Sequence, residues 1–320
     1  KKSITGYLPS AGVFDHVTVR VKSGNTYYWF DPTISFQRGS INDISYPDYE
    51  CGLVIGEGTT GLTMIDSKEK GDVRVNEVFD IKDMSGDAKL TVTTTYTGSF
   101  ADDIRNNFNS SSNYEMLKSF KDFYAPYYEH IIADSLTHTD NETTGAFTTI
   151  EYYRINDLWE IKDNIRKVVF ESYVINGAIR KPKETKRTMP FALNYPMHFR
   201  ESVEVNVPDD WDAEESSHKI ESPGFSLTTH FSYRNRKLLL LYEYENLKDA
   251  VNPEEMKSFL DAIKEKEDKT GYSLSKSMDN KPVITKPAKE TKTDRLTGNI
   301  IAGLVILLFI GVIVWRLRKI

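Results

Sequence analysis

Metal-binding signatures and disulfide-forming cysteines are almost absent from this 320-residue sequence. Cys51 is the single cysteine, which excludes a disulfide framework and a zinc site built from cysteines. None of the six histidines shows the HxH or HExxH spacing of metal sites. The net charge is −6 and no long basic stripe offsets it, so general nucleic-acid binding is disfavoured. We therefore expect a function without a metal or nucleic acid. Residues 56–61 fit GxGxxG, but the helix that dinucleotide binding needs does not follow them, so we expect no organic cofactor.

Long apolar runs are also lacking, with one exception near the C-terminus. Residues 300–315 carry no charge, and three preceding residues extend the run to about eighteen, near the lower limit for a helix that crosses ~30 Å of hydrocarbon. Trp315 suits a membrane interface, and three basic residues follow it. We predict a transmembrane helix at 298–316, a basic tail at 317–320 and a solvated linker at 270–297. The alternative is a buried core helix, although such a helix usually keeps a polar face.

Segments with the alternation and composition of β-strands dominate the middle of the sequence. With 39% hydrophobic and 12% aromatic residues, the chain can build a substantial core. We predict an α+β fold, mainly antiparallel β, with a β-rich domain at 70–268. The predicted strands cover residues 52–55, 73–79, 88–96, 144–155, 168–174, 202–207, 225–233 and 237–244. The predicted helices cover residues 102–108 and 114–124, and a third helix that Asn252 caps and Pro253 begins.

A β-hairpin is predicted near the N-terminus. Residues 16–22 alternate apolar and polar side chains, residues 26–31 favour β-structure, and Ser23–Gly24–Asn25 has the composition of a turn. With Ser23–Gly24 as the two-residue turn, His16 lies opposite Asp31. With Gly24–Asn25 as the turn, His16 is the diagonal neighbour of Asp31. Both registers place the two side chains on one face, about 5–8 Å apart by backbone geometry.

A carboxylate beside an imidazole is half of a nucleophilic triad. The carboxylate fixes the tautomer of the ring and raises its basicity, so the imidazole can serve as a general base. His16 and Asp31 are therefore the candidate catalytic residues. The alternative is a cross-strand ion pair without chemistry.

The residues around this pair resemble the second half of the transglutaminase-like core. The segment from Phe14 to Val19 reads Phe-Asp-His-Val-Thr-Val, and the segment from Tyr28 to Thr33 reads Tyr-Trp-Phe-Asp-Pro-Thr. That family has a papain-like arrangement of Cys, His and Asp, in that order along the chain. The resemblance covers residues 1–58 and implies that His16 is the proton-transferring base and Asp31 orients it.

The sequence departs from the family pattern at the nucleophile. The family's cysteine precedes the histidine at the start of a helix, and no cysteine precedes His16 here. Cys51 follows Asp31, so we interpret it as structural. We expect the chain to be the later part of a longer or processed protein, and to be inactive in acyl transfer by itself.

The middle region is similar to bacterial membrane proteins that pair a transglutaminase-like core with β-rich domains of unknown function. The resemblance rests on Phe191–Ala–Leu–Asn–Tyr–Pro196, on Val207–Pro–Asp–Asp–Trp211 and on the residues from Tyr96 to Arg105. It implies export, with the bulk of the protein periplasmic or extracytoplasmic and a short cytoplasmic tail. Basic residues flank both ends of the predicted span, so charge alone does not set the orientation. A tail-anchored cytosolic protein is the alternative.

Two functions follow as hypotheses. The first is amide acyl transfer or peptide hydrolysis on peptides or proteins of the cell envelope, when a cysteine completes the site. The second is a non-catalytic, membrane-anchored binding or scaffold protein whose β-rich domain recognises a protein partner. An in-frame cysteine upstream of Lys1 at the start of a helix would favour the first.

Overall fold

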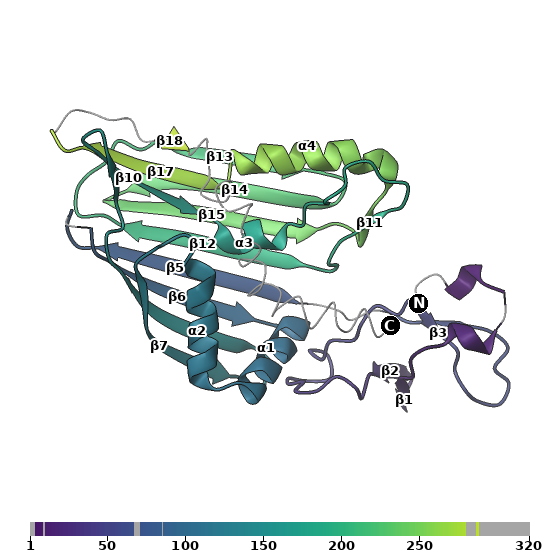
Figure 1. The fold of residues 1–320 in the computed structure, drawn as a ribbon. Coiled ribbons are helices and arrows are strands. Elements are labelled where there is room, and N and C mark those ends of the chain that lie inside the picture. Colours follow the sequence, from purple (N-terminus) through teal and green to yellow (C-terminus); the bar gives the residue numbers. More distant parts are fainter. Residues whose placement is uncertain (1–3, 9, 67–70, 85, 280–285, 288–320) are drawn as a thin grey trace.

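The computed structural model describes residues 4–8, 10–66, 71–84, 86–279 and 286–287, which form a small N-terminal region and a larger β-domain (Figure 1). Antiparallel strands dominate and helices are few, as the sequence predicts. The predicted transmembrane helix at 298–316 and the basic tail lie outside the described residues. Within the described ranges, no helix combines the length and the apolar character that a membrane crossing needs.

The β-domain is built on one eight-stranded sheet. Every neighbouring pair in it is antiparallel except β12 and β5, which run parallel at the centre. The strands lie in the order β13 (Ser216–Glu221), β14 (Phe225–Arg234), β15 (Lys237–Asn246), β12 (His198–Asn206), β5 (Asp72–Ile81), β6 (Ala88–Tyr96), β8 (Phe147–Ile155) and β7 (Ile131–Asp140).

Alternation of side chains gives the sheet one buried face and one open face. Along β5, Val73, Val75, Glu77 and Phe79 are buried, whereas the residues between them are partly or fully exposed. β6, β12 and β14 show the same period of two. One face of the sheet therefore carries the core of the domain and the other carries mostly polar side chains.

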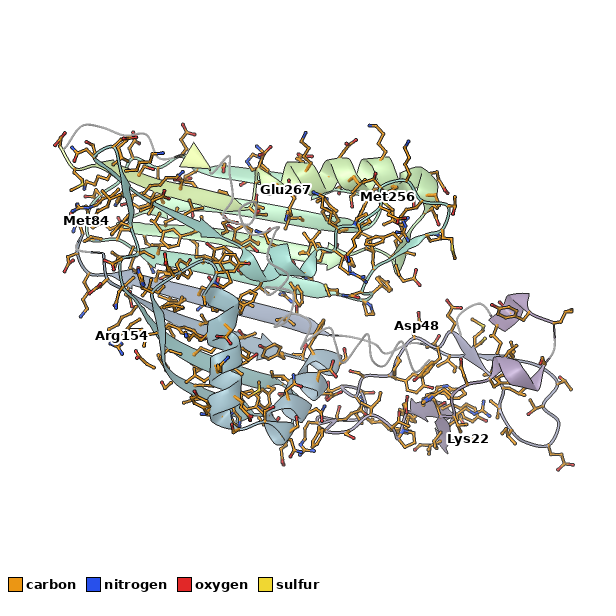
Figure 2. All side chains as sticks on the ribbon, in the orientation of Figure 1. Lys22, Asp48, Met84, Arg154, Met256 and Glu267 are labelled. Carbon is orange, nitrogen blue, oxygen red and sulfur yellow. The ribbon has the colours of Figure 1, made fainter. Side chains whose placement is uncertain are left out.

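Helices and a second sheet cover the buried face (Figures 1 and 2). α1 and α2 pack on the half formed by β5–β8, whereas α3 packs on β12 and α4 on β13. The second sheet has the order β18–β17–β10–β9. The covering elements are α1 (Gly98–Ser110), α2 (Asn113–Tyr124), α3 (Tyr173–Ala178), α4 (Met256–Glu267), β9 (Glu160–Lys162), β10 (Ile165–Glu171), β17 (Gly271–Ser277) and β18 (Lys286–Pro287).

The helix starts follow from capping residues. Ser112 and Glu115 form a reciprocal capping box at the start of α2. Asn252 and Glu255 form another, and Pro253 begins the short 3₁₀ turn Pro253–Glu255 that leads into α4. The predicted cap at Asn252 and the predicted start at Pro253 are confirmed.

Several predicted boundaries are wrong, each for a local reason. The strand predicted at 168–174 ends at Glu171, and α3 begins at Tyr173 because the buried Glu201 carboxylate accepts hydrogen bonds from Ser172 and from the Ile175 N–H at that helix start. The linker predicted from residue 270 starts too early, because Gly271–Ser277 forms β17 against β10.

The N-terminal region contains little regular structure. Its elements are two 3₁₀ turns (Ile4–Gly6 and Ala11–Val13), the hairpin β1 (Val19–Ser23) and β2 (Thr26–Phe30), and the short pair β3 (Cys51–Gly52) and β4 (Thr63–Met64). In the β-domain a further short pair joins β11 (Phe191–Ala192) and β16 (Ala250–Val251). The strand predicted at 16–22 begins only at Val19, where pairing with Phe30 starts. Of the strand predicted at 52–55 only Gly52 is in a strand, where it pairs with Thr63.

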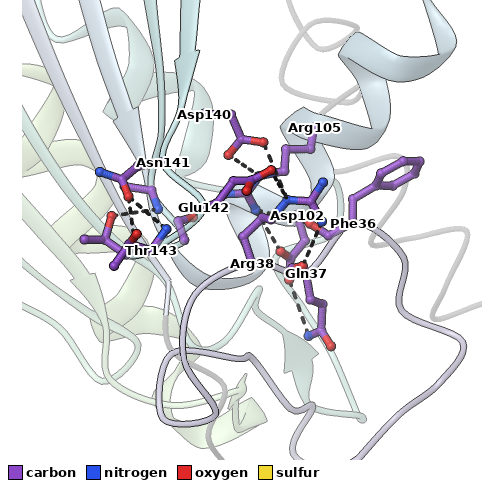
Figure 3. Close-up of polar contacts among 12 residues, drawn as sticks. Phe36, Gln37, Arg38, Asp102, Arg105, Asp140, Asn141, Glu142 and Thr143 are labelled. Atoms are coloured by element: carbon purple, nitrogen blue, oxygen red, sulfur yellow. Dashed lines mark hydrogen bonds and ion pairs between the residues drawn. The ribbon is translucent and has the colours of Figure 1, made fainter.

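The N-terminal region contacts the β-domain beside α1 (Figure 3). The Gly39 N–H donates to the Glu142 carbonyl oxygen at 3.0 Å, and Arg105 Nη1 donates to the Phe36 carbonyl oxygen at 3.4 Å. Gly145 packs so closely on this segment that a Cβ atom there would lie 2.7 Å from the Arg38 carbonyl oxygen. Backbone groups therefore make much of this contact.

Candidate active site

The hairpin brings His16 and Asp31 together. Val19 pairs with Phe30 and Ser23 with Thr26, so Gly24–Asn25 forms the turn, the second of the two predicted registers. Gly24 has a φ of +59°, which glycine adopts without strain. His16 Nε2 lies 2.8 Å from Asp31 Oδ2. The predicted proximity of the two side chains is thus observed, and it results from a diagonal placement.

Asp31 is almost fully enclosed by hydrogen-bond donors. Its side chain is 2% exposed, and that of His16 is 25% exposed. Oδ1 accepts from the Thr33 N–H at 3.0 Å and from the Thr33 hydroxyl at 2.6 Å. Oδ2 accepts from the Tyr49 hydroxyl at 2.6 Å as well as contacting His16. Burial alone would raise the pKa of Asp31, but the hydrogen bonds from Thr33, Tyr49 and His16 together lower it below its ordinary value.

The contact with Asp31 defines the role of each imidazole nitrogen. A buried carboxylate that accepts from Nε2–H selects the neutral tautomer with a lone pair on Nδ1. His16 keeps partial exposure, so Nδ1 is the nitrogen that can take a proton from a reacting group. The pair can therefore supply a base and its orienting carboxylate.

Two tyrosines surround the pair. The Tyr49 ring stacks on the His16 ring with centroids 5.3 Å apart, and Tyr46 meets Tyr49 edge-on at 5.4 Å. The Tyr46 hydroxyl donates to Thr18 Oγ1 at 2.9 Å. Thr33 belongs to the Tyr-Trp-Phe-Asp-Pro-Thr segment on which the family resemblance rests, so the sequence already places it beside Asp31. Tyr49 was missed, because it lies eighteen residues after Asp31 in a segment without periodic pattern.

Cys51 lies close to these residues in sequence and is buried at the start of β3. Its backbone N–H donates to the Tyr49 carbonyl oxygen at 2.6 Å. In the part of the chain that the structure describes, no group of three or more His, Cys, Asp or Glu side chains is placed to hold a metal ion.

Comparisons with known proteins reach only the β-domain. The model of DUF3858, a domain of unknown function with a solved structure, matches residues 166–275. No curated protein and no solved structure matches the chain. The match begins in β10 and ends in β17, so it includes the β12–β15 half of the large sheet but neither His16 nor Asp31.

The β-domain carries a second candidate site on its open face. A hollow of about 500 Å³ lies over the centre of the sheet. Arg74 and Arg200 are direct cross-strand neighbours in it, and both donate to Asp72, at 2.9 and 2.6 Å. The other side chains of the hollow are mostly hydroxyls and amides: Asn76, Thr93, Thr95, Ser202 and Thr228, with His230, Leu241 and Glu243 beside them.

Proposed function

We propose that His16 and Asp31 form the base and the orienting carboxylate of a transglutaminase-like Cys-His-Asp site. The observation that carries the proposal is the 2.8 Å contact between a buried carboxylate and a partly exposed imidazole, inside the segments that resemble that family. A merely structural ion pair needs neither an accessible ring nor four donors converging on the carboxylate.

In this proposal the nucleophile is a cysteine outside the printed sequence. His16 Nδ1 takes the thiol proton, and the thiolate attacks the carbonyl carbon of a carboxamide or peptide bond. The C–N bond breaks, the imidazolium returns its proton to the leaving nitrogen, and a thioester remains. Water or an amine then attacks the thioester, which gives hydrolysis or a new amide. Asp31 stabilises the imidazolium while it exists and remains ionised itself.

The setting of this chemistry is the cell envelope. The apolar segment at 298–316 supports a single-pass membrane anchor, and the resemblance to exported bacterial proteins favours a periplasmic or extracytoplasmic location for the bulk of the chain. Peptides and proteins with accessible carboxamides are the proposed substrates.

The test uses the complete protein, with whatever sequence precedes Lys1. His16→Ala should lower amidase or transamidase activity at least a thousandfold, and Asp31→Asn about a hundredfold or more. His130→Ala, which removes an exposed histidine of the β-domain, is the matched control and should retain activity. Unchanged activity in His16→Ala would falsify the proposal.

A second candidate function is ligand binding by the β-domain without catalysis. It is favoured by the polar hollow on the open face of the sheet, where Arg74 and Arg200 lie side by side. The double variant Arg74→Ala, Arg200→Ala should then release a cell-envelope partner that the parent chain retains. An upstream cysteine at a helix start favours the enzyme, whereas serine or alanine there favours this binding module.

A further inference from the structure

Tyr49 contacts both members of the candidate pair at once. Its hydroxyl donates to Asp31 Oδ2 at 2.6 Å, and its ring stacks on His16 with an interplanar angle of 27°. We propose that Tyr49 is a positioning residue, which holds the Asp31 carboxylate and the His16 imidazole in the geometry that proton transfer requires. This inference rests on the proposed function of the pair.

The hydroxyl of Tyr49 completes the set of donors around Asp31. Thr33 supplies two donors to Oδ1, and His16 and Tyr49 supply one each to Oδ2. Because both oxygens are held from two sides, the carboxylate cannot rotate without breaking short, charge-assisted hydrogen bonds. Without Tyr49, Oδ2 would depend on His16 alone, the group that must gain and lose protons.

The ring of Tyr49 restricts the imidazole. A stacked aromatic neighbour opposes rotation of the His16 ring out of the plane in which Nε2 faces Asp31. Tyr46 packs against Tyr49 edge-on and donates its own hydroxyl to Thr18, so the two tyrosines support each other. Among the described residues, the titratable side chains that interact with Asp31 are His16 and Tyr49, which bond to it directly, and Tyr46, which lies behind Tyr49.

Backbone hydrogen bonds on both sides of Tyr49 hold its ring beside His16 and Asp31. The Tyr49 N–H donates to the Pro47 carbonyl oxygen at 2.9 Å, and the Cys51 N–H donates to the Tyr49 carbonyl oxygen at 2.6 Å. Glu50 has a φ of +59°, and its carbonyl oxygen accepts from the Ile65 N–H at 2.8 Å. Such a conformation at a non-glycine residue persists where the surroundings hold it.

The first test is a titration of the whole 320-residue chain, with Asp31 followed through its carboxyl carbon and His16 through its ring carbons by NMR. Tyr49→Phe keeps the ring and removes one hydrogen-bond donor to the charged carboxylate. The midpoint of the Asp31 titration should therefore move to higher pH. Tyr46→Phe is the matched control: it also loses one tyrosine hydroxyl, but that hydroxyl donates to Thr18, and the Asp31 midpoint should stay in place. An unmoved Asp31 midpoint in Tyr49→Phe overturns the inference.

A measurement without substitution covers the case in which Tyr49→Phe does not fold. In the unmodified chain the ring signals of Tyr49 should shift with the same midpoint as the Asp31 carboxyl carbon. Tyr49 signals that do not respond to Asp31 protonation would overturn the inference just as well.

The second test measures catalysis in the complete protein. Tyr49→Phe should lower kcat about ten- to hundredfold, leave KM nearly unchanged and move the acid limb of the pH profile upward. If the titration shifts but no variant of His16 affects acyl transfer, the proposed function fails and the structural role of Tyr49 stands. If His16→Ala abolishes activity but Tyr49→Phe changes neither titration nor rate, the role of Tyr49 is refuted and the proposed function stands.

Discussion

Arg105 on α1 donates through Nε to Asp140 at the end of β7, with 2.8 Å between the two atoms. The Arg105 side chain is 4% exposed, and a second carboxylate, Asp102, accepts from Nη1 at 3.1 Å. The same guanidinium reaches the carbonyl oxygens of Phe36 and Gly145 (Figure 3). One buried cation thus connects α1, the turn between β7 and β8, and the segment of the N-terminal region that contains Phe36.

Removal of this cation should destabilise the β-domain strongly. Arg105→Ala leaves two carboxylates without their buried partner, so we expect a loss of about 3–5 kcal/mol in the free energy of unfolding. Arg154→Ala is the control, because Arg154 pairs with Asp134 at a largely exposed site and should change that free energy by less than about 1 kcal/mol. Urea denaturation of the two variants measures the difference. Equal losses would mean that the Arg105 network does not stabilise the fold.

Gly145 should be intolerant of a side chain for a reason beyond its backbone conformation. It has a φ of +72°, and an added Cβ would lie 2.7 Å from the Arg38 carbonyl oxygen. Gly58 has a similar φ of +80° with no atom within 4 Å of the added Cβ. Both alanine variants bear a conformational penalty of about 1–2 kcal/mol, but only Gly145→Ala should also loosen residues 36–39. Limited proteolysis in that segment should be faster in Gly145→Ala than in Gly58→Ala.

Buried glutamates should make the β-domain more stable in mild acid than in mild base. Burial raises the pKa of Glu151 and of Glu201 to about 7, and raises that of Glu77 well above its ordinary value. Between pH 4.5 and 7 the native state holds more protons than the unfolded state, so stability falls as pH rises through that window. The raised pKa of Glu151 alone contributes about 3 kcal/mol to the free energy of unfolding. This contribution is fully present below pH 4.5 and is lost above pH 7.

Glu151→Gln tests this dependence. The amide stays neutral, so the decline in unfolding free energy between pH 5 and pH 8 should be smaller than in the parent chain. Glu245→Gln makes the same chemical change at an exposed position on β15 and serves as control. A decline that Glu151→Gln leaves untouched would rule out Glu151 as its source.

The contact between Phe170 and Phe79 should contribute strongly to the packing of the second sheet on the large sheet. Phe170 on β10 and Phe79 on β5 are both fully buried, with ring centroids 4.9 Å apart. Phe170→Ala opens a cavity between the layers and should cost about 3–5 kcal/mol of unfolding free energy. Ile161→Ala, at an exposed position on the neighbouring β9, should cost less than about 0.5 kcal/mol. Thermal unfolding of the two variants gives the comparison.

The sequence predicts the strands and helices that show a periodic pattern, and it misses elements in which that pattern is absent. The alternating residues of β5, β6 and β14 predict their strands, and Asn252 with Pro253 predicts the start of the last helix. β7 is an edge strand with mostly exposed residues, so it shows no alternation. β17 is buried on both sides at its start, which also hides the period of two.

The candidate site shows the same division. Hairpin chemistry places His16 near Asp31, but two turn positions fit the sequence and only the pairing of Val19 with Phe30 selects between them. Tyr49 approaches the pair through a segment held by backbone hydrogen bonds to residues as distant as Ile65. No local pattern encodes such an approach, because the partners are far apart in the sequence.

The parallel pairing of β5 with β12 sets the order in which the domain can fold. Ser202 on β12 bonds to Asn76 on β5, 126 residues earlier, whereas the other pairings within each half of the sheet join nearer segments. During synthesis the β5–β8 half is complete long before β12 leaves the ribosome, and the edge of β5 then has no neighbour. Such an edge is a template for association with other chains until β12 arrives. Slow translation between residues 155 and 198 would therefore lower the yield of this protein through aggregation, without changing the stability of its folded state.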